Sequence, residues 1–121
     1  MARHFRPCDS GTSIFLYRDP VDFRKQSTGL AAIVEQNLGC NPFDGSLYAF
    51  TNRQRNKIKC LFWENNGFVL YYKSLAEEKF HWPKREETLV SLSVQQVNWL
   101  LDGYNINAMQ AHKKLSYESV F

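Results

Sequence analysis

Glycine and histidine, on which many catalytic sites depend, are few and scattered in this chain of 121 residues. Its 6 glycines stand apart, so the spaced glycine clusters of phosphate-binding loops are absent from the sequence. His4, His81 and His112 are distant from one another and from the cysteines, which gives no pattern of metal ligands. We therefore expect no metal, no cofactor and no enzymatic activity.

The acidic residues give no clear sign of a two-metal catalytic site, which needs several carboxylates that converge. Asp19 and Asp22 suit the start of a helix, Asp44 suits a turn, and Glu77 and Glu78 fall in a polar connector. These local roles explain the carboxylates without catalysis.

Cysteines and long apolar runs are also scarce. Cys8, Cys40 and Cys60 are odd in number and widely spaced, which fits neither a disulfide framework nor a zinc site. No run approaches the roughly eighteen apolar residues of a membrane span. The first residues lack the apolar region of a secretory signal. We expect a soluble cytoplasmic protein with reduced thiols and no membrane partner.

Positive charge is concentrated in the middle of the chain. The formal net charge is only +3, but residues 53–85 hold eight Lys and Arg against three Asp and Glu, and so supply the whole excess. Such a segment favours an acidic partner such as nucleic acid. The alternative is a solvated strand face whose cations guard a sheet edge against aggregation.

The pattern of apolar residues predicts an α+β fold in a single domain, with an antiparallel β-sheet meander packed against one or two helices. A buried strand is expected at 13–17, and short edge strands at Phe80–Trp82 and Thr88–Leu92. The meander strands are expected at 46–51, 57–64 and 67–73. The domain itself should span residues 13–104, between a flexible N-terminal arm at 1–12 and a partly disordered C-terminal tail at 105–121.

Two helices are expected. The second has a clear start, because Ser93 and Gln96 form a capping box and Leu92 can pack against Val97. The first helix has two readings. It begins either at Pro20 with Asp19 as its cap, or later with Thr28 as its cap after a separate turn over residues 20–27.

Four cations stand at two-residue spacing where the first two meander strands join: Arg53, Arg55, Lys57 and Lys59. Alternate residues of an extended strand point to one face, so these side chains are expected to form a comb that contacts DNA phosphates. Arg24, Lys25 and Lys73 are expected to widen this footprint. An alternative hypothesis is a protein-interaction adaptor with exposed aromatic residues, for which Trp63 and Trp82 are the candidates.

Short motifs follow one another in a fixed order along the chain. They are Asp22-Phe23-Arg24-Lys25, Gly29-Leu30-Ala31, Pro42-Phe43-Asp44-Gly45-Ser46-Leu47, Asn52-Arg53, Lys57-Ile58-Lys59, Lys73-Ser74-Leu75, Trp82-Pro83 and Leu100-Leu101-Asp102-Gly103. This series, spread from about Ile14 to Tyr104, resembles the TnpB accessory proteins of insertion sequence 66 elements, also called the Orf2-like family.

The resemblance implies a non-catalytic protein of a bacterial mobile element that assists transposition of DNA. Its implied partners are the transposon ends or non-specific duplex DNA, a separate transposase and another small accessory protein. The residues that fall on the family's motif are Arg24, Lys25, Arg53, Lys57, Lys59, Lys73 and Trp82. Relatives often carry acidic residues where Thr28 and Asn56 stand, so salt bridges made by those acids are not expected here.

Overall fold

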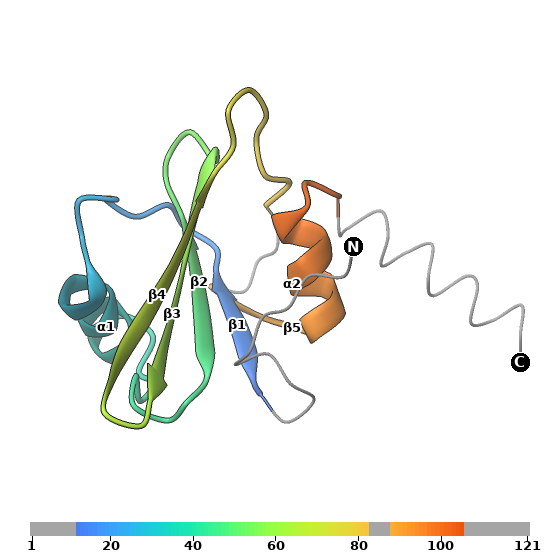
Figure 1. Ribbon diagram of the computed structural model, residues 1–121. Helices are drawn as coiled ribbons and strands as arrows, with labels where there is room; N and C mark the ends of the chain where they lie inside the picture. Colours follow the sequence, from blue (N-terminus) through green and yellow to red (C-terminus); the bar gives the residue numbers. More distant parts are fainter. Residues whose placement is uncertain (1–11, 83–87, 106–121) are drawn as a thin grey trace, which may run out of the picture.

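The structure is a computed structural model that describes residues 12–82 and 88–105. It contains five strands and two helices in one α+β domain (Figure 1). In chain order the elements are β1 (Ile14–Tyr17), α1 (Ser27–Gln36), β2 (Leu47–Thr51), β3 (Lys57–Glu64), β4 (Gly67–Ser74), β5 (Leu89–Leu92) and α2 (Val94–Leu101). The expected fold class is confirmed.

The strands form one sheet in the order β4-β3-β2-β1-β5. β2, β3 and β4 make the expected antiparallel meander, and β5 is an edge strand that runs antiparallel to β1. β1 and β2 pair in parallel, with Ile14 opposite Leu47. A parallel pair needs a crossover connection, and the segment containing α1 supplies it. This parallel pair was not predicted. The prediction of an edge strand at Phe80–Trp82 is wrong, since the chain there is irregular.

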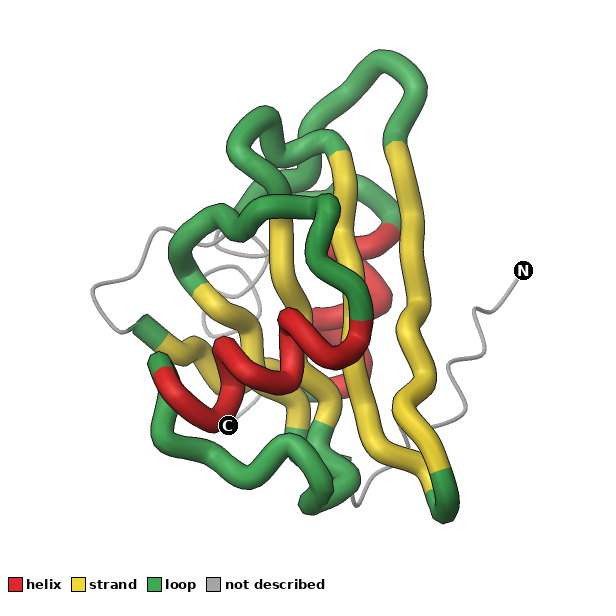
Figure 2. The backbone as a smooth tube through the Cα atoms, turned by 90° about the vertical axis from the view of Figure 1, so that its left-hand side faces the viewer, coloured by secondary structure: helices red, strands yellow, loops and turns green. Residues whose placement is uncertain are grey.

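The two helices cover opposite faces of the sheet, so the domain has three layers (Figures 1 and 2). The sheet face toward α2 packs Ile58, Cys60 and Phe62 of β3 with Val97, Leu100 and Leu101 of the helix. The face toward α1 packs Tyr48, Phe50 and Leu61 with Leu30 and Val34. Both faces of β3 are therefore buried along most of the strand.

The start of α1 differs from both predictions and has no side-chain cap. The residue before the helix, Gln26, makes no side-chain capping hydrogen bond. Asp19 lies well before the helix and is not its cap, and Thr28 lies inside the helix, so both predicted caps are wrong. The separate turn expected before the helix is present. Glycine suits position 29 in the first turn because it has no Cβ. A Cβ at this position would lie only 3.1 Å from the Cβ of Lys25.

The capping box of α2 is confirmed. The backbone N–H of Gln96 donates to Ser93 Oγ, and the backbone N–H of Ser93 donates to Gln96 Oε1. Leu92 and Val97 are both buried in one cluster, as a hydrophobic staple requires.

The segments expected as an N-terminal arm and a C-terminal tail lie outside the described residues, apart from Thr12 and Asn105. Among the residues that the structure describes, no helix is long and apolar enough to cross a membrane.

Candidate nucleic-acid interface

The loop between β2 and β3 is held in one conformation by the side chain of Asn52. Its Oδ1 accepts hydrogen bonds from the backbone N–H groups of Asn56 and Lys57, each at 3.1 Å. Its Nδ2 donates to Asn56 Oδ1 at 2.7 Å and to Gln54 Oε1 at 3.2 Å. Arg55 adopts the left-handed backbone conformation, with a φ of 60°. Arg53 and Arg55 thus lie in a turn, not on a strand, and strand alternation does not align them with Lys57.

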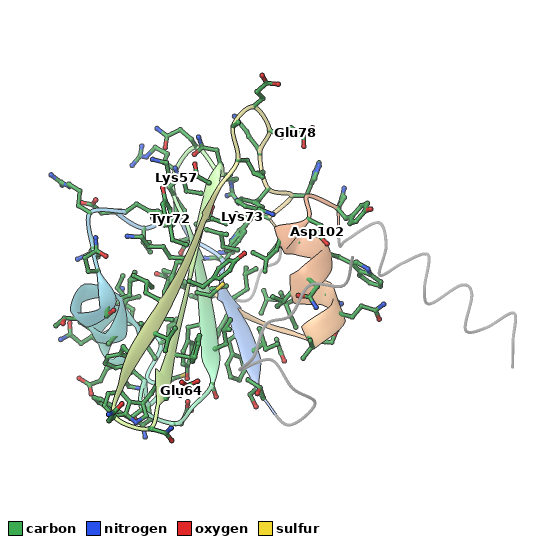
Figure 3. The ribbon with its side chains drawn as sticks, in the orientation of Figure 1. Lys57, Glu64, Tyr72, Lys73, Glu78 and Asp102 are labelled. Atoms are coloured by element: carbon green, nitrogen blue, oxygen red, sulfur yellow. The ribbon has the colours of Figure 1, made fainter. Side chains whose placement is uncertain are left out.

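The structure instead brings cations together across a hollow of about 660 Å³. Residues 20–24, in the chain that leads to α1, line one side. Asn52, Arg53, Gln54 and Lys57 line the other. We call this feature the basic hollow, because its lining within the described part of the chain holds Arg24, Arg53 and Lys57 against one acid, Asp22. Figure 3 shows Lys57 at this end of the sheet and Glu64 at the opposite end.

The Asp22 carboxylate holds Arg24 in place at the rim of the hollow. Arg24 donates from Nη2 to Asp22 Oδ2 at 2.7 Å and from Nε to both carboxylate oxygens at 3.1 Å. The side chain of Arg24 is nevertheless 92% exposed. These hydrogen bonds, with a further one from the backbone N–H of Arg24, lower the pKa of Asp22 to about 2. The carboxylate is charged at neutral pH, so the pair is neutral overall.

This pair makes a prediction about pH. Because the pKa of Asp22 is lowered, the ion pair is intact above the ordinary carboxyl pKa near 3.8 and is lost as the pH falls through about 2. Replacing Arg24 with methionine removes the guanidinium and its side-chain donors, so the pKa of Asp22 should rise most of the way toward its ordinary value. Carboxyl-carbon NMR titration measures this directly. A pKa of Asp22 that stays near 2 in the variant would show that Arg24 is not the cause.

Lys59 is not part of an exposed comb. It is only 5% exposed, and its Nζ donates to the backbone carbonyl oxygens of Phe23 at 2.9 Å and Lys25 at 2.8 Å. The ammonium also lies 4.9 Å from the centroid of the Phe23 ring and 5.8 Å from that of Tyr72. Its hydrogen-bonding capacity is used within the fold, where it ties the chain before α1 to the sheet. We leave it out of the interface for that reason.

Lys73 lies on the opposite face of the sheet from Lys57 and Lys59. It pairs with Ile58 across the β3–β4 ladder, so it shares the face that packs against α2. Its Nζ donates to the carbonyl oxygen of Leu101 at 2.6 Å. Leu101 is the last residue of α2, and the negative end of the helix dipole stabilises a cation there. Figure 3 shows Lys73 and Asp102 on this side. The footprint expected from Lys73 is therefore separated from the basic hollow.

Lys25 and the polar connector after β4 complete this end of the molecule. Lys25 is exposed and lines a smaller hollow that also contacts Asp22. The connector is tied to the β2–β3 loop, since the N–H groups of Leu75 and Phe80 donate to the carbonyl oxygens of Asn56 and Arg55. Exposed Glu77 and Glu78 lie on this connector, so acidic side chains flank the cations on one side.

The two tryptophans chosen as interaction residues differ in their surroundings. Trp82 is 3% exposed, and its Nε1 donates to the carbonyl oxygen of Tyr17 at 3.0 Å, so the expectation of an exposed Trp82 is wrong. Trp63 is partly exposed, and its ring lies edge-on to Phe43 and Phe68, with both centroids at 5.0 Å. Phe43 is 52% exposed. Phe43 was not among the predicted interaction residues because it stands in a turn, although an aromatic residue in a polar turn is a signal that the sequence contains.

Within residues 12–82 and 88–105, no three His, Cys, Asp or Glu side chains are grouped so that they could hold a metal ion. Cys40 is partly buried and Cys60 is buried.

Comparison with known proteins assigns the chain. Two similar proteins of Sinorhizobium fredii are the uncharacterized proteins y4jC and y4hO, each 29% identical to this chain. The first match covers 77% of this chain and 80% of the relative, and the second covers 80% and 84%. No solved structure matches significantly. The model of the family described as IS66 Orf2 like protein matches residues 12–111. The chain therefore belongs to the IS66 Orf2-like family of transposition accessory proteins.

Proposed function

We propose that this accessory protein assists transposition by binding DNA through the end of the sheet that carries the basic hollow. The observation that carries the proposal is the convergence of Arg24, Arg53 and Lys57 from two separate segments on one concave surface. Arg55 and Lys25 stand in the same two segments and extend the positive surface. The protein's DNA partner in the cytoplasm is either the transposon ends or duplex DNA bound without sequence preference.

Phosphate contacts explain the chemistry of this surface best. Arg and Lys neutralise backbone phosphates and fix the register of a protein on DNA, but they carry no sequence information by such contacts. With Lys59 and Lys73 engaged in the fold, four or five cations remain for phosphates. On the usual relation for duplex DNA, this gives a log–log salt slope of about −4.

Replacing Arg53, Arg55 and Lys57 together with alanine should make that slope shallower by about 2–3, because each phosphate contact contributes about 0.9. Fluorescence anisotropy of a short labelled duplex over a range of salt concentrations measures the slope. An unchanged slope would mean that DNA does not bind at this end of the molecule.

A matched pair of single variants controls for net charge. Lys57→Ala and Lys79→Ala each remove one positive charge, but only Lys57 lines the basic hollow. We expect Lys57→Ala to weaken DNA binding more than Lys79→Ala. Equal effects would mean that overall charge, and not the hollow, governs affinity.

A second candidate function is docking of the element's transposase or of its other small accessory protein. The observation that favours it is the exposed Phe43 ring packed against Trp63 and Phe68. Aromatic residues of this kind are common at the energetic centre of protein interfaces. Co-purification with the transposase that survives nuclease treatment and high salt, and is lost in Phe43→Ser, would support docking. Loss of the association on nuclease treatment would favour a DNA bridge.

A further inference from the structure

The basic hollow is pre-formed, because hydrogen bonds fix both of its walls. The backbone N–H of Val21 donates to the carbonyl oxygen of Thr51 at 2.9 Å, which joins the chain before α1 to the end of β2. Lys59 binds the carbonyl groups of Phe23 and Lys25 from beneath. The Asn52 side chain fixes the opposite wall. Because the protein is already ordered at this site, ligand binding loses little free energy to ordering of loops and side chains.

The lining combines three kinds of surface. Pro20, Val21 and Phe23 supply apolar contact area, while Arg53 and Lys57 supply positive charge. Gln54 accepts a hydrogen bond from Asn52 through Oε1, and within the described part of the chain its amide nitrogen has no hydrogen-bond partner. Among the described residues, Asp22 is the only carboxylate in the lining, and its charge is offset by Arg24. A volume of about 660 Å³ falls in the range typical of small-ligand sites.

We infer that the basic hollow accepts one nucleotide of an unpaired DNA strand. The phosphate binds between Arg53 and Lys57, and the base lies against the apolar wall within reach of the Gln54 amide. A regular duplex keeps its bases stacked and exposes only their edges in the grooves, so it cannot lay the face of a base against the apolar wall of the hollow. An unpaired strand can place a base there, and base contacts with aromatic or apolar side chains strengthen single-strand binding.

This inference rests on the proposed DNA-binding function and adds a preference for unpaired DNA. The first experiment is NMR of the isotope-labelled full-length protein titrated with a thymidine tetranucleotide. We expect shifts of backbone amides in residues 21–24 and 52–57. Inorganic phosphate at the same concentration should shift residues 53–57 only. Equal responses to both probes, or shifts elsewhere in the chain, would overturn the inference.

The second experiment compares oligothymidylate with a duplex of equal length at the same salt concentration. We expect the single strand to bind at least about fivefold more tightly, the lower limit for one stacked base. Gln54→Ala should reduce this preference, because it removes the amide donor to the base and changes no charge. Gln95→Ala, an exposed glutamine on α2, is the matched control and should change neither affinity.

The outcomes separate the two proposals. Duplex binding with the expected salt slope but no preference for the single strand would overturn the nucleotide site and leave the proposed function in place. Failure to bind either form of DNA would overturn both. A preference that persists unchanged in Gln54→Ala would place the unpaired base outside the basic hollow.

Discussion

Replacing Lys59 with methionine should lower the free energy of unfolding by about 2–4 kcal/mol, although lysine substitutions usually have small effects. The carbonyl groups of Phe23 and Lys25 lose two charge-assisted hydrogen bonds, at 2.9 and 2.8 Å. Methionine fills a similar volume, so the result reports the hydrogen bonds and not a cavity. Removing a buried ammonium also removes its desolvation cost, which is why the expected loss is smaller than two full hydrogen bonds to a charged group. Urea unfolding followed by circular dichroism measures it.

The matched control is Lys57→Met, which changes the same residue type two positions earlier on the same face of β3. Lys57 is partly exposed, so this substitution should change stability by less than about 0.5 kcal/mol. Hydrogen exchange provides a second measurement, because Lys59→Met should speed exchange in residues 22–28 and leave α2 unaffected. Equal stability of the two variants would mean that the carbonyl groups find other donors and that Lys59 is not a structural lysine.

Trp82→Ala should destabilise the domain by about 3–5 kcal/mol, the usual range for truncating a large buried aromatic residue. The indole is 3% exposed and lies in the cluster between the sheet and α2. Its removal leaves a cavity there and deprives the carbonyl group of Tyr17 of a donor at 3.0 Å. Thermal and urea unfolding measure the loss.

A milder variant separates the two contributions and serves if Trp82→Ala does not fold. Trp82→Phe keeps most of the apolar volume but removes the N–H donor, so it should cost about 1–2 kcal/mol. Affinity of the folded Trp82→Phe variant for DNA and for partner proteins should be unchanged. If Trp82→Phe had normal stability but bound DNA or partner proteins more weakly, Trp82 would be an interaction residue after all.

Local patterns predicted most of the secondary structure. The three meander strands were placed within one residue of their observed ends, because turn residues such as Asn65 and Asn66 interrupt continuous apolar runs. The start of α2 followed from Ser93 and Gln96, whose capping bonds involve neighbours in the sequence. Neither feature depends on distant parts of the chain.

The candidate site was predicted less well, because it depends on contacts between residues far apart in the sequence. Lys59 is 36 positions from Phe23, and Trp82 is 65 positions from Tyr17. A lysine among other cations indicates exposure, since lysine is rarely buried without partners. The partners of Lys59 are backbone carbonyl groups. Every residue has such a group, so the sequence does not show which ones will accept these hydrogen bonds.

The order of motifs determined the family, and the apolar runs and turn residues determined where the strands and the second helix lie. Only the tertiary structure decided that β1 and β2 run parallel, that helices cover both sheet faces, and that Arg24 joins Arg53 and Lys57 around one hollow. The physical reason is that alternation fixes which side chains share a strand face. What packs on that face is chosen by burial and hydrogen bonding among segments that the chain brings together only when it folds.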